Sequence, residues 1–381
     1  MLSVAVGWQV YELTSKPISL GYAGLAQFFP GVLLFLVAGH CADRFDRRKI
    51  LMVCFASYAI CATLLATVTL SGHVSVSSIY GLLALTGATQ AIAGPAAQSL
   101  TPELVLTEHF SVAVAWGSTI FTASTILGPM LGGLLYGISH GPTVVYAVAG
   151  AAYLNGLGMT VLMNIRAGHI EKKDPSLRAA FAGFRYVWDH KMILGCISLD
   201  LFAVLLGGAV ALLPVFAKDI LHTGPWGLGV LRSSPAVGAV VTALWVAYHP
   251  LEKRAGVKML WCVAVFGVGT IIFGLSSNVL LSIAALLLVG GADMISVVVR
   301  GTLVQLATPP PMRGRVSAVN LLFTGASNQV GQFESGFTAQ WLGTVPAIVL
   351  GGLGAIIMVA IWAWRFSEIR RVDNLAGRDM R

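Results

Sequence analysis

The sequence predicts an all-α integral membrane protein with about twelve transmembrane helices in two halves of six. Hydrophobic residues make up 56% of the chain and charged residues only 10%, whereas soluble proteins carry about 25% charged residues. The apolar residues form runs of about 20, the length that crosses about 30 Å of hydrocarbon as a helix. Because these runs are long and do not alternate with polar residues, they exclude the strands of a membrane β-barrel.

Each expected helix is an apolar run bounded by proline, glycine, polar or charged residues. The first run ends near Thr14, and the others of the first half lie at residues 19–42, 50–71, 76–97, 110–137 and 142–165. After a polar segment, six more runs follow at residues 191–217, 225–248, 258–276, 279–307, 315–343 and 344–366. We therefore expect an N-terminal half at 1–166, a linker at 167–190, a C-terminal half at 191–367 and a tail at 368–381.

Short sequence matches relate the two halves. Pro17 and Pro225 are each followed four residues later by glycine, and the Thr-Pro pair at 101–102 matches the pair at 308–309. Both matches lie at an offset of 207 or 208 residues, so they indicate one parallel duplication.

The same offset places the start of the first helix about 16 residues before Met1. The roughly 14 residues that remain give about 21 Å of helix, which is less than a full crossing. We therefore expect a truncated first helix, through either a start codon assigned too late or a genuinely shortened protein.

The linker predicts an amphipathic helix at the membrane surface. Four apolar residues recur there at spacings of four, three and four, with basic residues on the other side. A linker that merely happens to be helical is the alternative interpretation. The apolar residues are Leu177, Phe181, Phe184 and Trp188, and the basic residues are Arg178, Arg185 and Lys191.

Basic residues predict the orientation in the membrane. Twenty Lys and Arg residues fall in the loops and tail on one side, and only Lys16 and Lys218 fall on the other. Basic residues next to a membrane span are retained in the cytoplasm, so both termini are expected there. This topology, together with anionic lipid, accounts for the net charge of +8, and no nucleic acid partner is expected.

A dense charged loop follows the second expected helix. Its pattern, G-x-x-x-D-R-x-x-R-R-K from Gly39 to Lys49, resembles the loop signature of the major facilitator superfamily of secondary transporters. The run at 8–14 and the loop at 305–316 are similar to the bacterial exporter branch that includes the enterobactin exporter. That resemblance covers nearly the whole chain and implies a proton-driven permease of the bacterial inner membrane with the major facilitator fold.

The same resemblance implies a gating role for this loop. Asp43 and Arg47 are expected to belong to a cytoplasmic charge network that holds the outward-facing state and releases on switching. The gating residues are Gly39, Asp43, Arg44, Arg47 and Arg48. In the simpler interpretation, the arginines only set the topology.

The fifth expected helix contains Gly128, Pro129, Gly132 and Gly133, which resemble the second half of the antiporter motif of exporters. Small residues let helices approach closely and the proline bends the helix, so this face is a candidate rocking interface. Ordinary close packing is the alternative. The fourth helix departs from the superfamily pattern, because it lacks the early arginine of many proton antiporters.

Ionisable residues deep within the expected helices indicate the mechanism, because each costs at least about 2.5 kcal/mol at the bilayer centre unless it is paired or hydrated. Asp200 and Asp293 lie at comparable depth, and in the major facilitator fold their helices line the central cavity, so both acids are proton or cargo candidates. For each of them, buried ion pairing, such as Asp200 with an arginine, is the alternative. Arg300, seven residues after Asp293 on one helix face, is expected to reach toward it as a structural partner. Arg232 and Glu334 lie nearer the outer side as candidates for an extracellular latch.

Polar residues within the expected helices are weaker candidates for the transport path. Gln9, Gln27, Gln90, Asn328 and Gln329 belong to this group. Such residues more often form hydrogen bonds between helices than contact a cargo.

The sequence therefore predicts a secondary active transporter, a proton-driven exporter of a small amphipathic molecule such as a siderophore or a drug. Two alternatives stay open: an importer or facilitator of a small or lipid-like solute, and a membrane receptor or regulator that does not transport. The sequence has no phosphate loop, metal-ligand spacing or nucleophile with its base, so we expect no enzyme, cofactor or metal. The expected partners are a small-molecule cargo, protons and the lipid bilayer, and the protein is expected to be a monomer.

Overall fold

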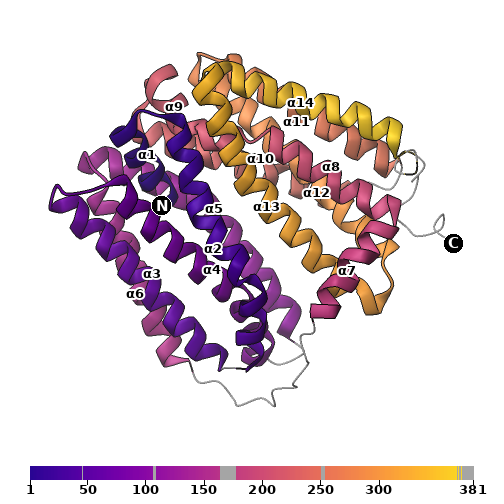
Figure 1. Ribbon diagram of the computed structural model, residues 1–381, viewed down its shortest axis with the longest axis horizontal. Helices are drawn as coiled ribbons and strands as arrows, with labels where there is room; N and C mark the ends of the chain where they lie inside the picture. The colour runs from indigo at the N-terminus through magenta and orange to yellow at the C-terminus, as the bar shows by residue number, and fades with distance from the viewer. Residues whose placement is uncertain are drawn as a thin grey trace. The chain divides into compact units, whose positions relative to one another are not determined.

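The computed structural model describes residues 1–44, 46–105, 109–163, 177–249, 254–366, 368 and 370, without the side chains of 35–44, 99, 101–103, 111, 177–182 and 310–311. The chain divides into two compact units (Figure 1). Unit 1 comprises Met1–Pro175 with Gly224–Val230, and unit 2 comprises Ser176–Thr223 with Leu231–Arg381. Within the described residues, ten helices are long and apolar enough to cross a membrane.

Unit 1 consists of helices that pack side by side. They are α1 (Leu2–Thr14), α2 (Pro17–Arg44), α3 (Arg47–Leu70), α4 (Val76–Leu104), α5 (Phe110–Ser139) and α6 (Thr143–Leu162). α2 packs on α4, and α3 packs on both α4 and α6. Side chains of Asp46 and Ser75 cap the starts of α3 and α4, where backbone N–H groups have no partner within the helix.

Unit 2 contains α7 (Leu177–Asp189), α8 (Lys191–Leu206), a 3₁₀ turn (Ala209–Leu212), α9 (Leu213–Val215), a π turn (Phe216–Ile220), the greater part of α10 (Gly224–Tyr248), α11 (Ala255–Leu275), α12 (Val279–Ala307), α13 (Pro310–Leu342) and α14 (Thr344–Arg365). α11 packs against α12 and α14, and α8 packs against α13 and α14. Ile193, Met259, Val299 and Val316 belong to the buried apolar core between α8, α11, α12 and α13. This core fixes the positions of the helices that carry the polar residues of unit 2.

The all-helical membrane fold is confirmed, and two of the twelve expected spans, α1 and α13, are not among the ten apolar spans of the described residues. α1 has 13 residues, and α13 has 33 residues but carries Asn320, Asn328, Gln329 and Gln332 along its length. α13 begins at Pro310, five residues before the expected start at 315. Proline is tolerated in the first turn of a helix, because the N–H groups there have no partner within the helix.

The run at 191–217 was expected to form one continuous helix, but α8 ends at Leu206. Gly207 and Gly208 interrupt it, and the span continues as the 3₁₀ turn, α9 and the π turn. A Cβ on Gly207 would lie 2.4 Å from the Phe266 ring, and the Gly208 carbonyl accepts a hydrogen bond from Ser335 Oγ at 3.2 Å. Neighbouring helices thus approach this break too closely for larger residues.

The expected amphipathic helix of the linker is present as α7. The rings of Phe184 and Trp188 stack with centroids 6.2 Å apart and are 43% and 64% exposed, whereas Val187 is buried. Arg185 forms an exposed ion pair with Asp189 at 3.8 Å. The side chains of Leu177, Arg178 and Phe181 lie outside the described residues, and the position of α7 at the membrane surface stays a prediction.

Candidate functional site

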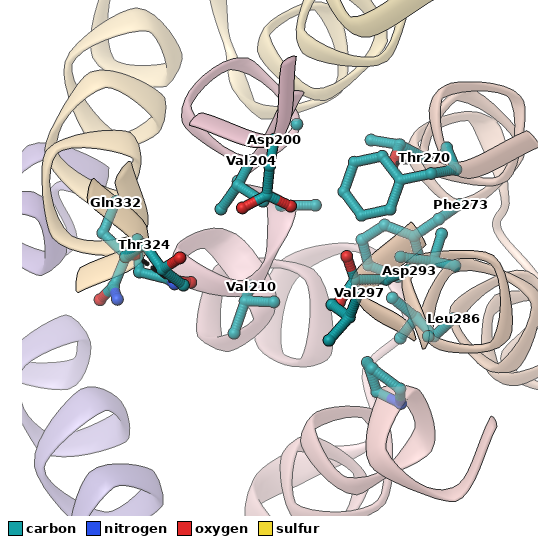
Figure 2. Close-up of a pocket in the computed structure, with 18 of the residues that line it drawn as sticks. Asp200, Val204, Val210, Thr270, Phe273, Leu286, Asp293, Val297, Thr324 and Gln332 are labelled. Atoms are coloured by element: carbon teal, nitrogen blue, oxygen red, sulfur yellow. Dashed lines mark hydrogen bonds between the residues drawn. The ribbon is translucent and has the colours of Figure 1, made fainter. Parts of the chain in front are cut away.

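Unit 2 encloses a cavity of about 220 Å³ (Figure 2). Each helix presents one face to it, because the lining residues recur every three or four positions, the spacing of one side of a helix. The lining residues are Asp200 and Val204 of α8, Gly207–Val210 of the break and 3₁₀ turn, Pro235 of α10, Phe266, Thr270 and Phe273 of α11, Leu286, Val289, Gly290, Asp293, Val297 and Arg300 of α12, and Thr324, Asn328 and Gln332 of α13.

A buried ion pair joins two of these helices. The guanidinium of Arg300 on α12 contacts the carboxylate of Asp200 on α8, and the two residues are only 4% and 6% exposed. Buried charges are tolerated when they are paired, since an isolated charge would lose its hydration without compensation. The sequence analysis offered Asp293 as the partner of Arg300. The structure corrects this, because α8 brings a carboxylate directly against the guanidinium, whereas Asp293 lies two helical turns away on α12.

Asp293 lies on the cavity wall without a protein partner. Its carboxylate forms no hydrogen bond or ion pair with the described residues, and Figure 2 shows it facing the open space across from Asp200, with Thr324 and Gln332 on another wall. Both predicted acids therefore reach one cavity. They differ in that only Asp200 is neutralised by an arginine.

A second, smaller void lies next to both acids. It measures about 10 Å³ and is lined by Asp200, Ala203, Val204, Val263, Phe266, Asp293 and Ser296. A polar void of roughly 10–15 Å³ has room for one water molecule. The two carboxylates therefore border one space of about the volume of a single water molecule.

The uncharged polar residues of the cavity use some of their donors locally. The Thr270 hydroxyl donates to the Phe266 carbonyl at 2.9 Å, and the Asn328 amide Nδ2 donates to the Thr324 carbonyl at 2.8 Å. Their oxygens remain available to accept hydrogen bonds. The remaining lining is largely apolar, including the rings of Phe266 and Phe273.

The other two deep charges of the sequence analysis lie outside the cavity lining. Glu334 of α13 accepts a hydrogen bond from Thr338 Oγ1, one turn further on, at 2.8 Å. Arg232 lies on α10, and within the described part of the chain no ion pair links it to Glu334. The suggested latch between the two residues stays a prediction.

The charged loop of unit 1 is described only in part. The side chains at 39–44, including Asp43 and Arg44, lie outside the described residues. Arg48 Nε donates to the Thr160 carbonyl at 3.0 Å, and its Nη2 donates to the Val161 carbonyl. Arg48 thereby binds the carbonyl end of α6, where the helix dipole favours a cation. This role of Arg48 is not visible in the sequence, because its partners are backbone atoms 112 and 113 residues away.

The small residues of α5 approach other helices closely within unit 1. A Cβ on Gly132 would lie 2.8 Å from Met1 Cα, and one on Gly133 would lie 2.5 Å from the Pro225 carbonyl oxygen. Pro129 lies inside the helix. Close packing at Gly132 and Gly133 is thus present, whereas the rocking role of the set with Gly128 stays a prediction.

Polar residues of unit 1 join its helices. Gln9 Nε2 of α1 donates to Thr69 Oγ1 at 3.0 Å, and Tyr146 donates to Gln9 Oε1 at 2.6 Å. Gln27 Nε2 donates to Gln90 Oε1 at 3.4 Å. These three glutamines act between helices, as polar residues within membrane spans commonly do, whereas Asn328 lines the cavity of unit 2.

Comparisons with known proteins agree with this architecture. A family described as transmembrane secretion effector matches residues 1–379. The chain is similar to the enterobactin exporter EntS of Citrobacter koseri, with 25% identity over 97% of this chain and 89% of the relative. The EntS protein of Escherichia coli O1:K1 is 26% identical over 94% of this chain and 82% of its own length.

Solved structures show the same fold at low identity. A bacterial homologue of the human lysosomal transporter Spinster, in an inward-facing and occupied conformation, aligns with a TM-score of 0.76 at 13% identity, covering 96% of this chain and 93% of that one. The nucleoside transporter NupG aligns with a TM-score of 0.71 at 14% identity, over 96% and 94% of the two chains.

Proposed function

The chain belongs to the transmembrane secretion effector family of major facilitator transporters, and from this membership we propose that it exports a small amphipathic molecule in exchange for protons. The similarity of the chain to enterobactin exporters supports the outward direction of this transport. We place the protein in the bacterial inner membrane with both termini in the cytoplasm, on the asymmetry of its basic residues. Asp43 and its neighbouring arginines are proposed to gate the cytoplasmic side.

The observation that carries the proton coupling is the unneutralised Asp293 in the cavity. Besides Asp293, the charged groups that face this cavity are Asp200 from α8 and Arg300 from α12. The lining contributed by α10, α11 and α13 is uncharged. Since Asp200 and Arg300 neutralise each other, one negative charge remains, and it belongs to Asp293. A lone acid at this depth is tolerated when it exchanges with a proton or another cation.

The small void next to both acids supports a proton path. A single water there would connect Asp293 with Asp200. Proton transfer along such a chain requires no large movement of either helix. We propose that Asp293 carries the proton and that Asp200 neutralises Arg300.

The test is transport by the full chain in proteoliposomes. A pH gradient is imposed, and uphill movement of a panel of fluorescent amphipathic compounds and a catecholate siderophore is measured. We expect the wild-type protein to accumulate at least one compound against its gradient, and Asp293→Asn to lose uphill transport while keeping downhill exchange, because the amide keeps the size of the side chain but cannot take up a proton. Asp189→Asn, which removes an exposed acid of α7, is the control and should behave as wild type. Uphill transport by Asp293→Asn with unchanged pH dependence would contradict the proposal.

A further inference from the structure

We propose that the cargo carries a cationic head group, which binds to Asp293 in the cavity of unit 2 with its apolar part against Phe266. This inference rests on the proposed transport function and specifies the chemical class of its cargo. Three independent features of the cavity carry it: its charge, its hydrogen-bonding groups and its size.

The charge of the cavity favours a cation. Of the three charged residues that line it, Asp200 and Arg300 form a buried pair. Asp293 is left with one negative charge in a largely apolar space. An anionic ligand would have to approach this carboxylate without a free arginine to neutralise it, which costs free energy at low dielectric.

The lining also carries hydrogen-bond acceptors that a cationic N–H head group can use. Thr270 and Asn328 direct donors to backbone carbonyls of their own helices, and their oxygens remain as acceptors. The break after α8 also favours a cation, because Gly207 and Gly208 line the cavity at the carbonyl end of that helix. The carbonyl end of a helix dipole attracts cations.

The size of the cavity limits the part of the cargo that it holds. Sites for drug-sized ligands measure about 300–1,000 Å³, whereas this cavity measures about 220 Å³. It therefore accommodates one ring and a head group. Phe266 supplies an aromatic ring, and aromatic faces attract both apolar groups and cations.

A cation bound at Asp293 has a direct consequence for coupling. The carboxylate can hold either a proton or the head group of the cargo, since both compensate the same charge. Binding of the cargo would then release the proton, and binding of a proton would release the cargo. This mutual exclusion is the exchange that an antiporter requires.

The test is equilibrium binding to the purified full chain in detergent, without any gradient. The probes are benzylammonium and phenylmethanesulfonate, which share a benzyl ring and carry tetrahedral head groups of opposite charge. We expect wild type and Asp189→Asn to bind the ammonium at least about tenfold more tightly than the sulfonate. We also expect the ammonium to bind more weakly as the pH falls, because protons compete for Asp293.

Two variants of Asp293 complete the experiment. Asp293→Asn should lose the preference for the ammonium, and Asp293→Glu, which restores the charge, should recover it. Melting temperatures of both variants show that they are folded. Equal binding of the two probes by wild type, no binding of the ammonium, or an unchanged preference in folded Asp293→Asn would each overturn the inference.

The result is separable from that of the transport assay. Because binding is measured without a gradient, a protein that binds the ammonium at Asp293 but transports nothing uphill would refute the proposed function and leave the site intact. Conversely, uphill export of only neutral or anionic compounds, without ammonium binding, would refute the cationic cargo and leave proton-driven export intact.

Discussion

Arg300 of α12 forms its ion pair with Asp200 of α8 and leaves Asp293, seven residues away on its own helix, without a charged partner among the described residues. This choice of partner divides the two acids of the cavity into different roles. The paired acid ties two helices together, whereas the unpaired acid is open to ligands. The predictions below separate these roles by experiment.

Asp200→Asn is expected to lower stability and to leave proton coupling in place. Removing one partner of a buried ion pair leaves an uncompensated charge, which costs about 3–5 kcal/mol. The melting temperature of the purified protein in detergent should therefore fall, while uphill transport in proteoliposomes keeps its pH dependence. The double variant Asp200→Asn with Arg300→Gln should recover part of the lost stability, because no buried charge remains. Loss of coupling in a stable Asp200→Asn protein would instead place the coupling proton on Asp200.

Asp293→Asn is expected to have the opposite effects on stability and on proton coupling. Asp293→Asn should melt at the same temperature as wild type or slightly higher, because it removes an unpaired acid from an apolar space. Its uphill transport should be lost, and Asp293→Glu should restore part of it. A large drop in melting temperature for Asp293→Asn would indicate that this acid has a structural partner.

Gly290→Ala is expected to destabilise unit 2. A Cβ at this position would lie 1.9 Å from the Pro235 carbonyl oxygen of α10, and backbone atoms cannot yield as a flexible side chain can. Overpacking of this kind costs about 1–3 kcal/mol. Gly301→Ala on the same helix is the matched control, because a Cβ there would meet nothing within 4 Å. Equal melting temperatures for the two variants would contradict the close approach of α10 and α12.

Arg48→Ala is expected to loosen the carbonyl end of α6. The guanidinium donates to the carbonyls of Thr160 and Val161, and a charge-assisted hydrogen bond contributes about 1.5–3 kcal/mol. Limited proteolysis should cleave the variant faster near the end of α6, whereas the neighbouring Lys49→Ala should match wild type. Identical cleavage of both variants would show that the contact contributes no stability.

Asp43→Ala tests the gating role that the loop signature implies. The variant should fold and insert normally, because the substitution lies outside the apolar spans, and its turnover should fall because a gate contact is lost. Transport rate per inserted protein is the measurement, with melting temperature as the check on folding. A normal transport rate would remove Asp43 from the gate.

The sequence alone determined the fold class and the positions of most helices. Apolar runs of about 20 residues have one solution in a bilayer, because every backbone polar group must be satisfied within the run. The bounds expected for the tenth helix, 279–307, agree with α12, where Asn278 caps the first turn. The cost of burying a charge likewise made Asp200, Asp293 and Arg300 recognisable as unusual positions in the sequence.

The tertiary structure alone decided which of these charges meet and where the helix of Asp200 ends. Spacing along one helix made Asp293 the expected partner of Arg300, but the pairing depends on the distance between helices, which a sequence does not contain. The break after Leu206 was equally hidden, because glycine occurs 43 times in the chain and only the packing of Phe266 and Ser335 against Gly207 and Gly208 distinguishes this pair. Contacts between distant segments determine both features, and these contacts form only when the helices pack.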